Sequence, residues 1–109
     1  MIRVKETVIC LVGSVKQVED WRKWTEVLTR RGYVVLEAGW YGADKSGISE
    51  EEKRLQVDVH SKKLDLANVI GIIEKPDGSL GKGTERDIDH ARARGKVVIP
   101  VGFIGENFP

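Results

Sequence analysis

Residues 67–73 read ANVIGII, and residues 81–87 read GKGTERD. The first stretch is an apolar run typical of a buried strand, and the second opens a segment that the pattern predicts as a helix ending at Gly95. A glycine-rich turn between a strand and a helix leaves backbone N–H groups free beside the positive end of the helix dipole. This junction therefore favours a phosphate, or a sugar and its developing charge, as the ligand.

A second junction of the same type lies near the start of the chain. The apolar residues 8–12 run into Gly13 and Ser14, which precede an amphipathic segment. Two glycine-bearing strand ends in a short chain point to a nucleotide or sugar-phosphate ligand. Ser14 is then either an N-cap of the following helix or a ligand contact.

Apolar runs rich in Val and Ile alternate with amphipathic stretches, which is typical of strand–helix units around a parallel sheet. The predicted strands are residues 7–13, 33–36, 68–73 and 96–101, and the predicted helices are residues 15–31, 49–64 and 84–95. Right-handed crossovers then give a three-layer, Rossmann-like or flavodoxin-like α/β domain with four parallel strands in the order 2-1-3-4. In this order the two glycine junctions face one crevice at the carboxyl ends of the strands.

Several single residues support these boundaries. Ser49 and Glu52 fit a capping box at the start of the second helix, and Gly32 stands where the first helix ends. Pro100 predicts an edge position for the last strand, because proline has no N–H to donate. Cys10 lies inside an apolar run and is expected to be a small core residue.

The composition limits the possible functions. The 109 residues form one predicted domain, residues 1–109, and 40% hydrophobic with 32% charged residues is typical of a globular chain. Lys and Arg number 18 against 17 Asp and Glu, and the resulting net charge of +1 argues against binding to duplex nucleic acid. No signal peptide or membrane span is recognisable, so a cytoplasmic location is expected.

The sequence resembles the nucleoside 2-deoxyribosyltransferase-like superfamily, in particular its short bacterial and phage branch, over about residues 7–101. The motifs that carry the resemblance are VGS at 12–14, RGYVVL at 31–36, EEEK at 50–53, HSKKLDLAN at 60–68, GKGTERDI at 81–88 and ARARGK at 91–96. The resemblance implies cleavage of the N-glycosidic bond of a deoxynucleoside or its 5′-monophosphate, with no cofactor. In such enzymes a carboxylate attacks the anomeric carbon, and another base or water then displaces the enzyme.

The family's nucleophile is a Glu, and its position is found here by counting. In the family this Glu lies four residues before an alanine of the helix and eight residues before a Gly-Lys pair. Counted from Ala91 and from Gly95, both spacings lead to Asp87, whose side chain is one methylene shorter than that of Glu. Some members of the family carry the nucleophile in a Gly-x-Gly-x-Glu turn, and the same count from Gly81 and Gly83 leads to Glu85 instead. The agreement of two spacings favours Asp87 as the nucleophile.

The family's second catalytic carboxylate lies eight residues before the Asp of an Ala-Asp pair. In this chain the pair is Ala67-Asn68, so the residue at the carboxylate position is His60. The short branch tends to carry His there. His60 is then the acid–base or sugar-orienting partner, or a histidine with an ordinary structural role. The other histidine is His90, and no Cys stands at ligand spacing, so no metal site is expected.

The two junctions and the loop after the second strand complete the predicted site. The expected substrate contacts are Gly13, Ser14, Gly81, Lys82, Gly83, Thr84, and for the base Trp40 and Tyr41. Structural alternatives exist for several of them. Thr84 also fits the N-cap of the third helix, with Asp87 as the acid of its capping box. Glu85 also fits a solvent-exposed acid in the first helical turn, and Lys82 also fits an exposed charge on a loop.

The first functional hypothesis is an N-glycosidase or deoxyribosyltransferase-like enzyme. The alternative is a nucleotide-binding sensor or sequestering module without catalysis. This alternative is favoured because Asp87 is one methylene shorter than the family's Glu, and a displaced carboxylate can lower the reaction rate by a large factor. A third reading is a phosphoribohydrolase of the cytokinin-activating type, whose Gly-x-Gly-Thr-x-x-Glu motif is similar to residues 81–87. That family is longer and has an Arg-bearing segment with no counterpart here.

The sequence also predicts self-association. A chain of this length forms a shallow crevice, and ligand pockets usually bury most of their ligand. Trp21, Trp24 and Val27 give the first helix more bulky apolar surface than one face needs. The resembling enzymes work as oligomers, so we expect a homodimer or larger assembly with the first or second helix at the interface.

Overall fold

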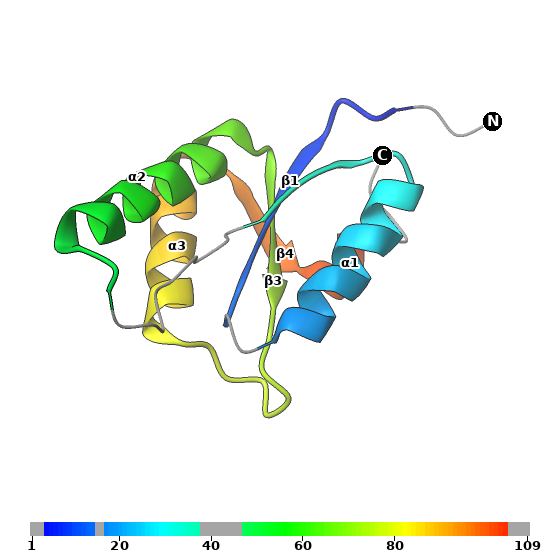
Figure 1. Cartoon of the computed structure of the whole chain (residues 1–109). Helices are drawn as coiled ribbons and strands as arrows, with labels where there is room; N and C mark the ends of the chain where they lie inside the picture. Colours follow the sequence, from blue (N-terminus) through cyan, green and yellow to red (C-terminus); the bar gives the residue numbers. More distant parts are fainter. Residues whose placement is uncertain (1–3, 15–16, 38–46, 105–109) are drawn as a thin grey trace.

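The apolar runs form a parallel sheet at the centre of the molecule (Figure 1). The computed structural model describes residues 4–14, 17–37 and 47–104. The strands of this part are β1 (Val8–Gly13), β2 (Val34–Glu37), β3 (Val69–Ile73) and β4 (Val97–Pro100). Their order is β2-β1-β3-β4 and each neighbouring pair is parallel, which confirms the predicted fold class and strand order.

Burial along the strands follows from this order. The central strands β1 and β3 are covered on both faces, so Ile9, Cys10, Leu11 and Val12 are completely buried, and all of β3 is buried. This is why both strands are continuous apolar runs rather than alternating ones. The edge strands are more exposed, and Pro100 lies in edge strand β4, as predicted.

The helices cover the two faces unequally. Helix α1 (Val18–Arg30) lies on one face, and α2 (Glu50–Leu66) and α3 (Lys82–Ala93) lie side by side on the other (Figure 1). Trp21 and Leu28 of α1 belong to the first hydrophobic core. Leu64 of α2 and Ile88 of α3 belong to the second. The first core is completed by the 3-10 helix η1 (Val101–Phe103) and the residue after it.

Trp21 is a core residue rather than spare apolar surface. Its side chain is only 7% exposed, and its indole N–H donates to the carbonyl of Ser14 at 3.0 Å. Trp24 and Val27 are half-buried. Helix α1 therefore presents less bulky apolar surface than expected, because Trp21 belongs to the core and Trp24 packs against that core.

Two of the predicted helix ends are confirmed. Gly32, with φ of 93°, follows α1, and the N–H of Tyr33 donates to the carbonyl of Leu28 at 3.1 Å. This is the Schellman arrangement that favours glycine after a helix. At the start of α2, the hydroxyl of Ser49 accepts from the N–H of Glu52 at 3.1 Å, so Ser49 is the N-cap, as predicted.

The predicted starts of the other two helices are wrong. The N-cap of α1 is Gln17 rather than Ser14, and the N-cap of α3 is Gly81 rather than Thr84. The first N–H groups of a helix have no partner within it, so glycine costs less there than in the interior. As a result Lys82, Gly83 and Thr84 are helical, and Asp87 lies in the second turn of α3.

Within residues 4–14, 17–37 and 47–104, none of the helices combines the length and the apolar character that crossing a membrane requires.

Candidate functional site

A cavity of about 580 Å³ opens at the carboxyl end of β1, between α2 and the start of α3. One face of α2 lines it with Lys53, Gln56, Val57, His60, Ser61 and Leu64. Helix α3 and its N-cap contribute Gly81, Gly83, Thr84, Arg86, Asp87 and His90. The wall is completed by Gly13, Ser14, Ile48 and Lys75. The cavity lies where parallel α/β sheets usually bind their ligands.

Most of the predicted site residues meet at this cavity. Those that line it are Gly13, Ser14, His60, Gly81, Gly83, Thr84 and Asp87. Lys82 and Glu85 are exposed on α3 and do not line the cavity. Trp40 and Tyr41 lie outside the described residues.

His60 and Asp87 touch each other directly. Nε2 of His60 donates to Oδ2 of Asp87 at 2.8 Å, and the two side chains are 7% and 20% exposed. Their neighbours fix them, because Leu64 and Ile88 anchor the same helix segments in the core under the sheet. The pair therefore joins α2 to α3 and holds one carboxylate oxygen in a fixed direction at the cavity wall.

Cys10 lies in the same hydrophobic core as Leu64 and Ile88. Burial, together with the negative charge of Asp87, raises the pKa of its thiol to about 12, and the positive charge of Lys63 opposes this increase. A thiol with this pKa is protonated at neutral pH and is a poor nucleophile. Cys10 is thus a core residue, as the sequence predicts.

The glycines at the start of α3 are not required by the fold. Gly81 has φ of −76° and ψ of 162°, an extended conformation open to any residue. A Cβ at Gly81 would have Lys75 Nζ as its nearest neighbour, at 3.9 Å, and a Cβ at Gly83 would have Arg86 Nη2 at 3.9 Å. Neither steric contact nor backbone conformation requires glycine at these positions. The absence of side chains therefore lets a ligand come close to the first N–H groups of α3.

Cationic groups surround this end of the cavity. Lys75 Nζ and Arg86 Nη2 lie close to the glycines of α3, as their 3.9 Å distances show. Lys53 lies on the opposite wall, and its ammonium pairs with Glu50 at 3.1 Å. Together with the N-terminus of α3, these side chains make the cavity favourable for an anionic group.

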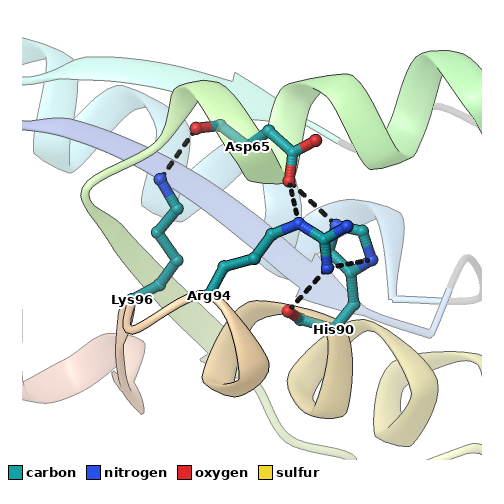
Figure 2. A network of polar contacts seen from close by, with 4 residues as sticks. All are labelled: Asp65, His90, Arg94 and Lys96. Carbon is teal, nitrogen blue, oxygen red and sulfur yellow. Dashed lines mark hydrogen bonds and ion pairs between the residues drawn. The ribbon is translucent and has the colours of Figure 1, made fainter.

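A second His–Asp contact joins the same two helices further along (Figure 2). Nε2 of His90 donates to Oδ1 of Asp65 at 2.9 Å, and Arg94 Nη1 donates to Nδ1 of His90 at 3.3 Å. Arg94 Nε also pairs with Asp65 at 3.1 Å, and Lys96 donates to the Asp65 carbonyl at 2.8 Å. Both ring nitrogens of His90 are engaged, so this network is a clamp between α2 and α3 although His90 borders the cavity.

The side-chain amide of Asn68 has a structural role at the amino-terminal ends of the central strands β1 and β3. Its Oδ1 accepts from the N–H of Val8 at 2.8 Å, and its own N–H donates to the carbonyl of Val8 at 2.8 Å. Asn68 thus fixes the first residue of β1 beside β3. The cavity lies at the opposite end of β1, so Asn68 does not line it.

The sequence analysis does not predict the other α2 side chains that line the cavity as site residues, nor does it predict Lys75, Arg86 and His90. Gln56 and Val57 belong to no motif, and the motifs that contain Lys53, Ser61 and Leu64 assign them no role. Together with His60, these residues stand at positions 53, 56, 57, 60, 61 and 64, which repeat at intervals of three and four, the spacing of one helix face. Starting from His60, this periodicity is the signal that identifies them. Lys75 has no comparable signal, because a loop brings it to the site.

No protein-family model matches the chain, and no curated protein matches it significantly. Among the described residues, no group of three or more His, Cys, Asp or Glu side chains is arranged to hold a metal ion.

Proposed function

We propose that this protein cleaves the N-glycosidic bond of a deoxynucleoside or its 5′-monophosphate, as a hydrolase or a deoxyribosyltransferase-like enzyme. The observation that supports this most directly is the 2.8 Å contact between His60 and Asp87 at a cavity of about 580 Å³. A cavity of this volume is in the range that holds a small-molecule ligand. The proposal also agrees with the family that the sequence motifs resemble.

In the proposed reaction Asp87 is the nucleophile. His60 holds Oδ2, which leaves Oδ1 for attack on the anomeric carbon of the sugar. The bond from that carbon to the base nitrogen breaks as the new C–O bond forms, and its electron pair leaves with the base, which takes up a proton. Water, or the nitrogen of a second base, then displaces the carboxylate and regenerates the enzyme.

The cations and the start of α3 favour a substrate that carries a 5′-phosphate. Lys75 and Arg86 lie near Gly81 and Gly83 and would neutralise the phosphate, while the free N–H groups of α3 would donate to its oxygens. Ser14 and Thr84 also line the cavity, and in the proposed complex their hydroxyls would bind the sugar. We therefore expect monophosphates to bind more tightly than the corresponding nucleosides.

The direct test is to incubate the protein with each of the common deoxynucleosides and their 5′-monophosphates and to measure free base by chromatography. Release above a control without protein supports the proposal, and release with a second base present distinguishes transfer from hydrolysis. The absence of release from every substrate would contradict it.

The clamp in Figure 2 supplies matched controls for the catalytic pair. Asp87→Asn and Asp65→Asn each remove one carboxylate from a His–Asp contact between α2 and α3. We expect Asp87→Asn and His60→Asn to lower base release by about 10²–10⁴-fold, the usual contribution of such groups. Asp65→Asn and His90→Asn are expected to change stability more than activity. Equal losses of activity in both pairs would assign both contacts to structure.

A sensor or sequestering module without catalysis is the second candidate function. The observation that favours it is the similarity of the two His–Asp contacts, 2.8 Å and 2.9 Å, since the second one is a structural clamp. This function predicts micromolar or tighter binding of a deoxynucleotide by calorimetry, with the ligand recovered intact. It also predicts that Asp87→Asn retains binding.

A further inference from the structure

The face of α2 that points away from the sheet is unusually apolar. Leu55, Val59 and Leu66 are 61%, 45% and 69% exposed, and the helical repeat places them within about 40° of one another. His60 and Leu64 are buried on the opposite face. A surface helix normally carries polar residues on its outer face, so α2 is apolar on two opposite sides. Exposed apolar side chains gathered in this way indicate a partner.

We propose that this face binds the same face of a second copy of the chain, with the two α2 helices antiparallel about a two-fold axis. Such an interface is self-complementary, because each contact occurs twice. When Leu55 lies opposite Val59 of the second copy, the same register places Glu52 opposite Lys62 of the second copy. The result is an apolar centre flanked by two ion pairs.

The charges on α2 select this partner and this direction. The first turn is acidic, with Glu50, Glu51 and Glu52, whereas Lys62 lies near the other end. Glu52 and Lys62 are both exposed, and neither forms an ion pair within the described part of the chain. Parallel helices would bring the acidic turns together, but antiparallel helices bring each acidic turn to a lysine and also align the helix dipoles favourably.

The proposed interface reaches the cavity. The same register brings Leu66 of the second copy to the level of Ile48, which lines the cavity wall. The second copy therefore covers the side of the site where Ile48 lies. Assembly does not depend on which reaction the site performs, so the interface and the proposed function fail or succeed separately.

The oligomeric state can be measured by sedimentation velocity or light scattering. A contact confined to one helix pair is small, so we expect a micromolar dimer and a measurement from about 1 to about 200 µM. The average mass should rise from 12.2 kDa toward twice that value over this range. A mass of 12.2 kDa at every concentration would overturn the proposal.

Variants test the surface and the register. Leu55→Glu should raise the dimer dissociation constant at least about tenfold, since it places a charge in the apolar centre. Phe103→Glu alters another exposed apolar residue, 66% exposed on η1, and should leave the constant unchanged. Circular dichroism checks that both variants are folded. A dimer that survives Leu55→Glu would show that α2 is not the interface.

The charge-swap variants are specific to the antiparallel register. Glu52→Lys alone and Lys62→Glu alone each bring like charges together and should weaken the dimer about tenfold or more at low salt. The double variant restores opposite charges and should return the dissociation constant to within a few-fold of the original. If the single changes weaken the dimer and the double change does not restore it, the proposed register is wrong.

Discussion

Two glycines at the cavity, Gly13 and Gly83, differ in what the fold asks of them. A Cβ at Gly13 would lie 2.8 Å from the carbonyl oxygen of Ile73, a distance that backbone atoms cannot accommodate without moving. The neighbouring strands β1 and β3 therefore need glycine at this position. A Cβ at Gly83 would meet only the end of the Arg86 side chain, at 3.9 Å, so the fold leaves that position free.

This difference predicts opposite results for two alanine variants. Gly83→Ala should keep or raise stability, by up to about 1 kcal/mol, because alanine is the better helix former. If a ligand approaches the backbone there, Gly83→Ala should also weaken deoxynucleotide binding at least about tenfold. Gly13→Ala should destabilise by about 1–3 kcal/mol through overpacking. Urea unfolding and calorimetric titration measure both effects, and unchanged binding by Gly83→Ala would exclude that close approach.

Cys10 offers a test of burial at the level of one atom. Its thiol pKa of about 12 lies far above the pH of ordinary thiol reagents, so the reactive thiolate is almost absent in the folded protein. We expect a disulfide reagent at about pH 8 to modify Cys10 only as fast as the protein unfolds, and rapidly in denaturant. Fast labelling of the native protein would show that β1 opens without global unfolding.

At the level of helices and strands, the sequence predicts the architecture well because burial decides it. Apolar runs that are covered on both faces read as strands, and the crossover rule then orders them. The starts of α1 and α3 were predicted wrongly because local capping patterns compete there. Thr84 fits an N-cap by its side chain, but the helix begins at Gly81, which caps without one. A pattern of side chains does not reveal which backbone carbonyl accepts the first helical hydrogen bond.

The candidate site is only partly visible in the sequence. Motif spacings single out His60 and Asp87 separately, and the packing of α2 beside α3 brings them to 2.8 Å. The same packing brings His90 to Asp65, which no motif predicts. Contacts between helices depend on how the helices pack on the sheet, and single-chain spacing carries no information on that distance.

The Asp65 clamp predicts a pH dependence of stability. The hydrogen bond from His90 lowers the pKa of Asp65 from 3.8, and the charges of Arg94 and Lys62 act in the same direction. A carboxylate with a lower pKa in the folded state stabilises the fold above its unfolded pKa and loses this effect as the pH falls through its folded pKa. Asp65→Asn should therefore be destabilising at neutral pH, with a difference that shrinks below about pH 4.

Urea unfolding of the two proteins at several pH values measures this difference. The control is Asp58→Asn, because Asp58 is an exposed acid of the same helix and forms no ion pair within the described residues. A destabilisation by Asp65→Asn that is the same at acidic and neutral pH would show that the clamp acts through packing rather than through charge.

At the scale of the whole molecule, the two faces of the sheet are covered by different means. Two helices, α2 and α3, cover one face (Figure 1). They form most of the cavity wall and both His–Asp contacts, and Figure 2 shows the contact between Asp65 and His90. Helix α1 alone cannot cover the other face. Val101 of η1 and the following Ile104 complete that core, and both are buried beside residues of α1 and the central strands.

Ile104 therefore covers part of the sheet face that α1 leaves uncovered, and truncating its side chain should lower the stability of the whole domain. It is completely buried, and its Cδ1 lies 3.0 Å from where a Cβ of Gly71 would be, so it packs directly onto the bare backbone of the central strand β3. Ile104→Ala should destabilise the protein by about 2–5 kcal/mol, the usual cost of such a cavity. The neighbouring Phe103 is 66% exposed, and Phe103→Ala should cost no more than about 0.5 kcal/mol. Denaturant unfolding followed by circular dichroism compares the two. If Ile104→Ala costs as little as Phe103→Ala, then α1 is sufficient to cover its face of the sheet, and the segment after β4 is not part of the cooperative core.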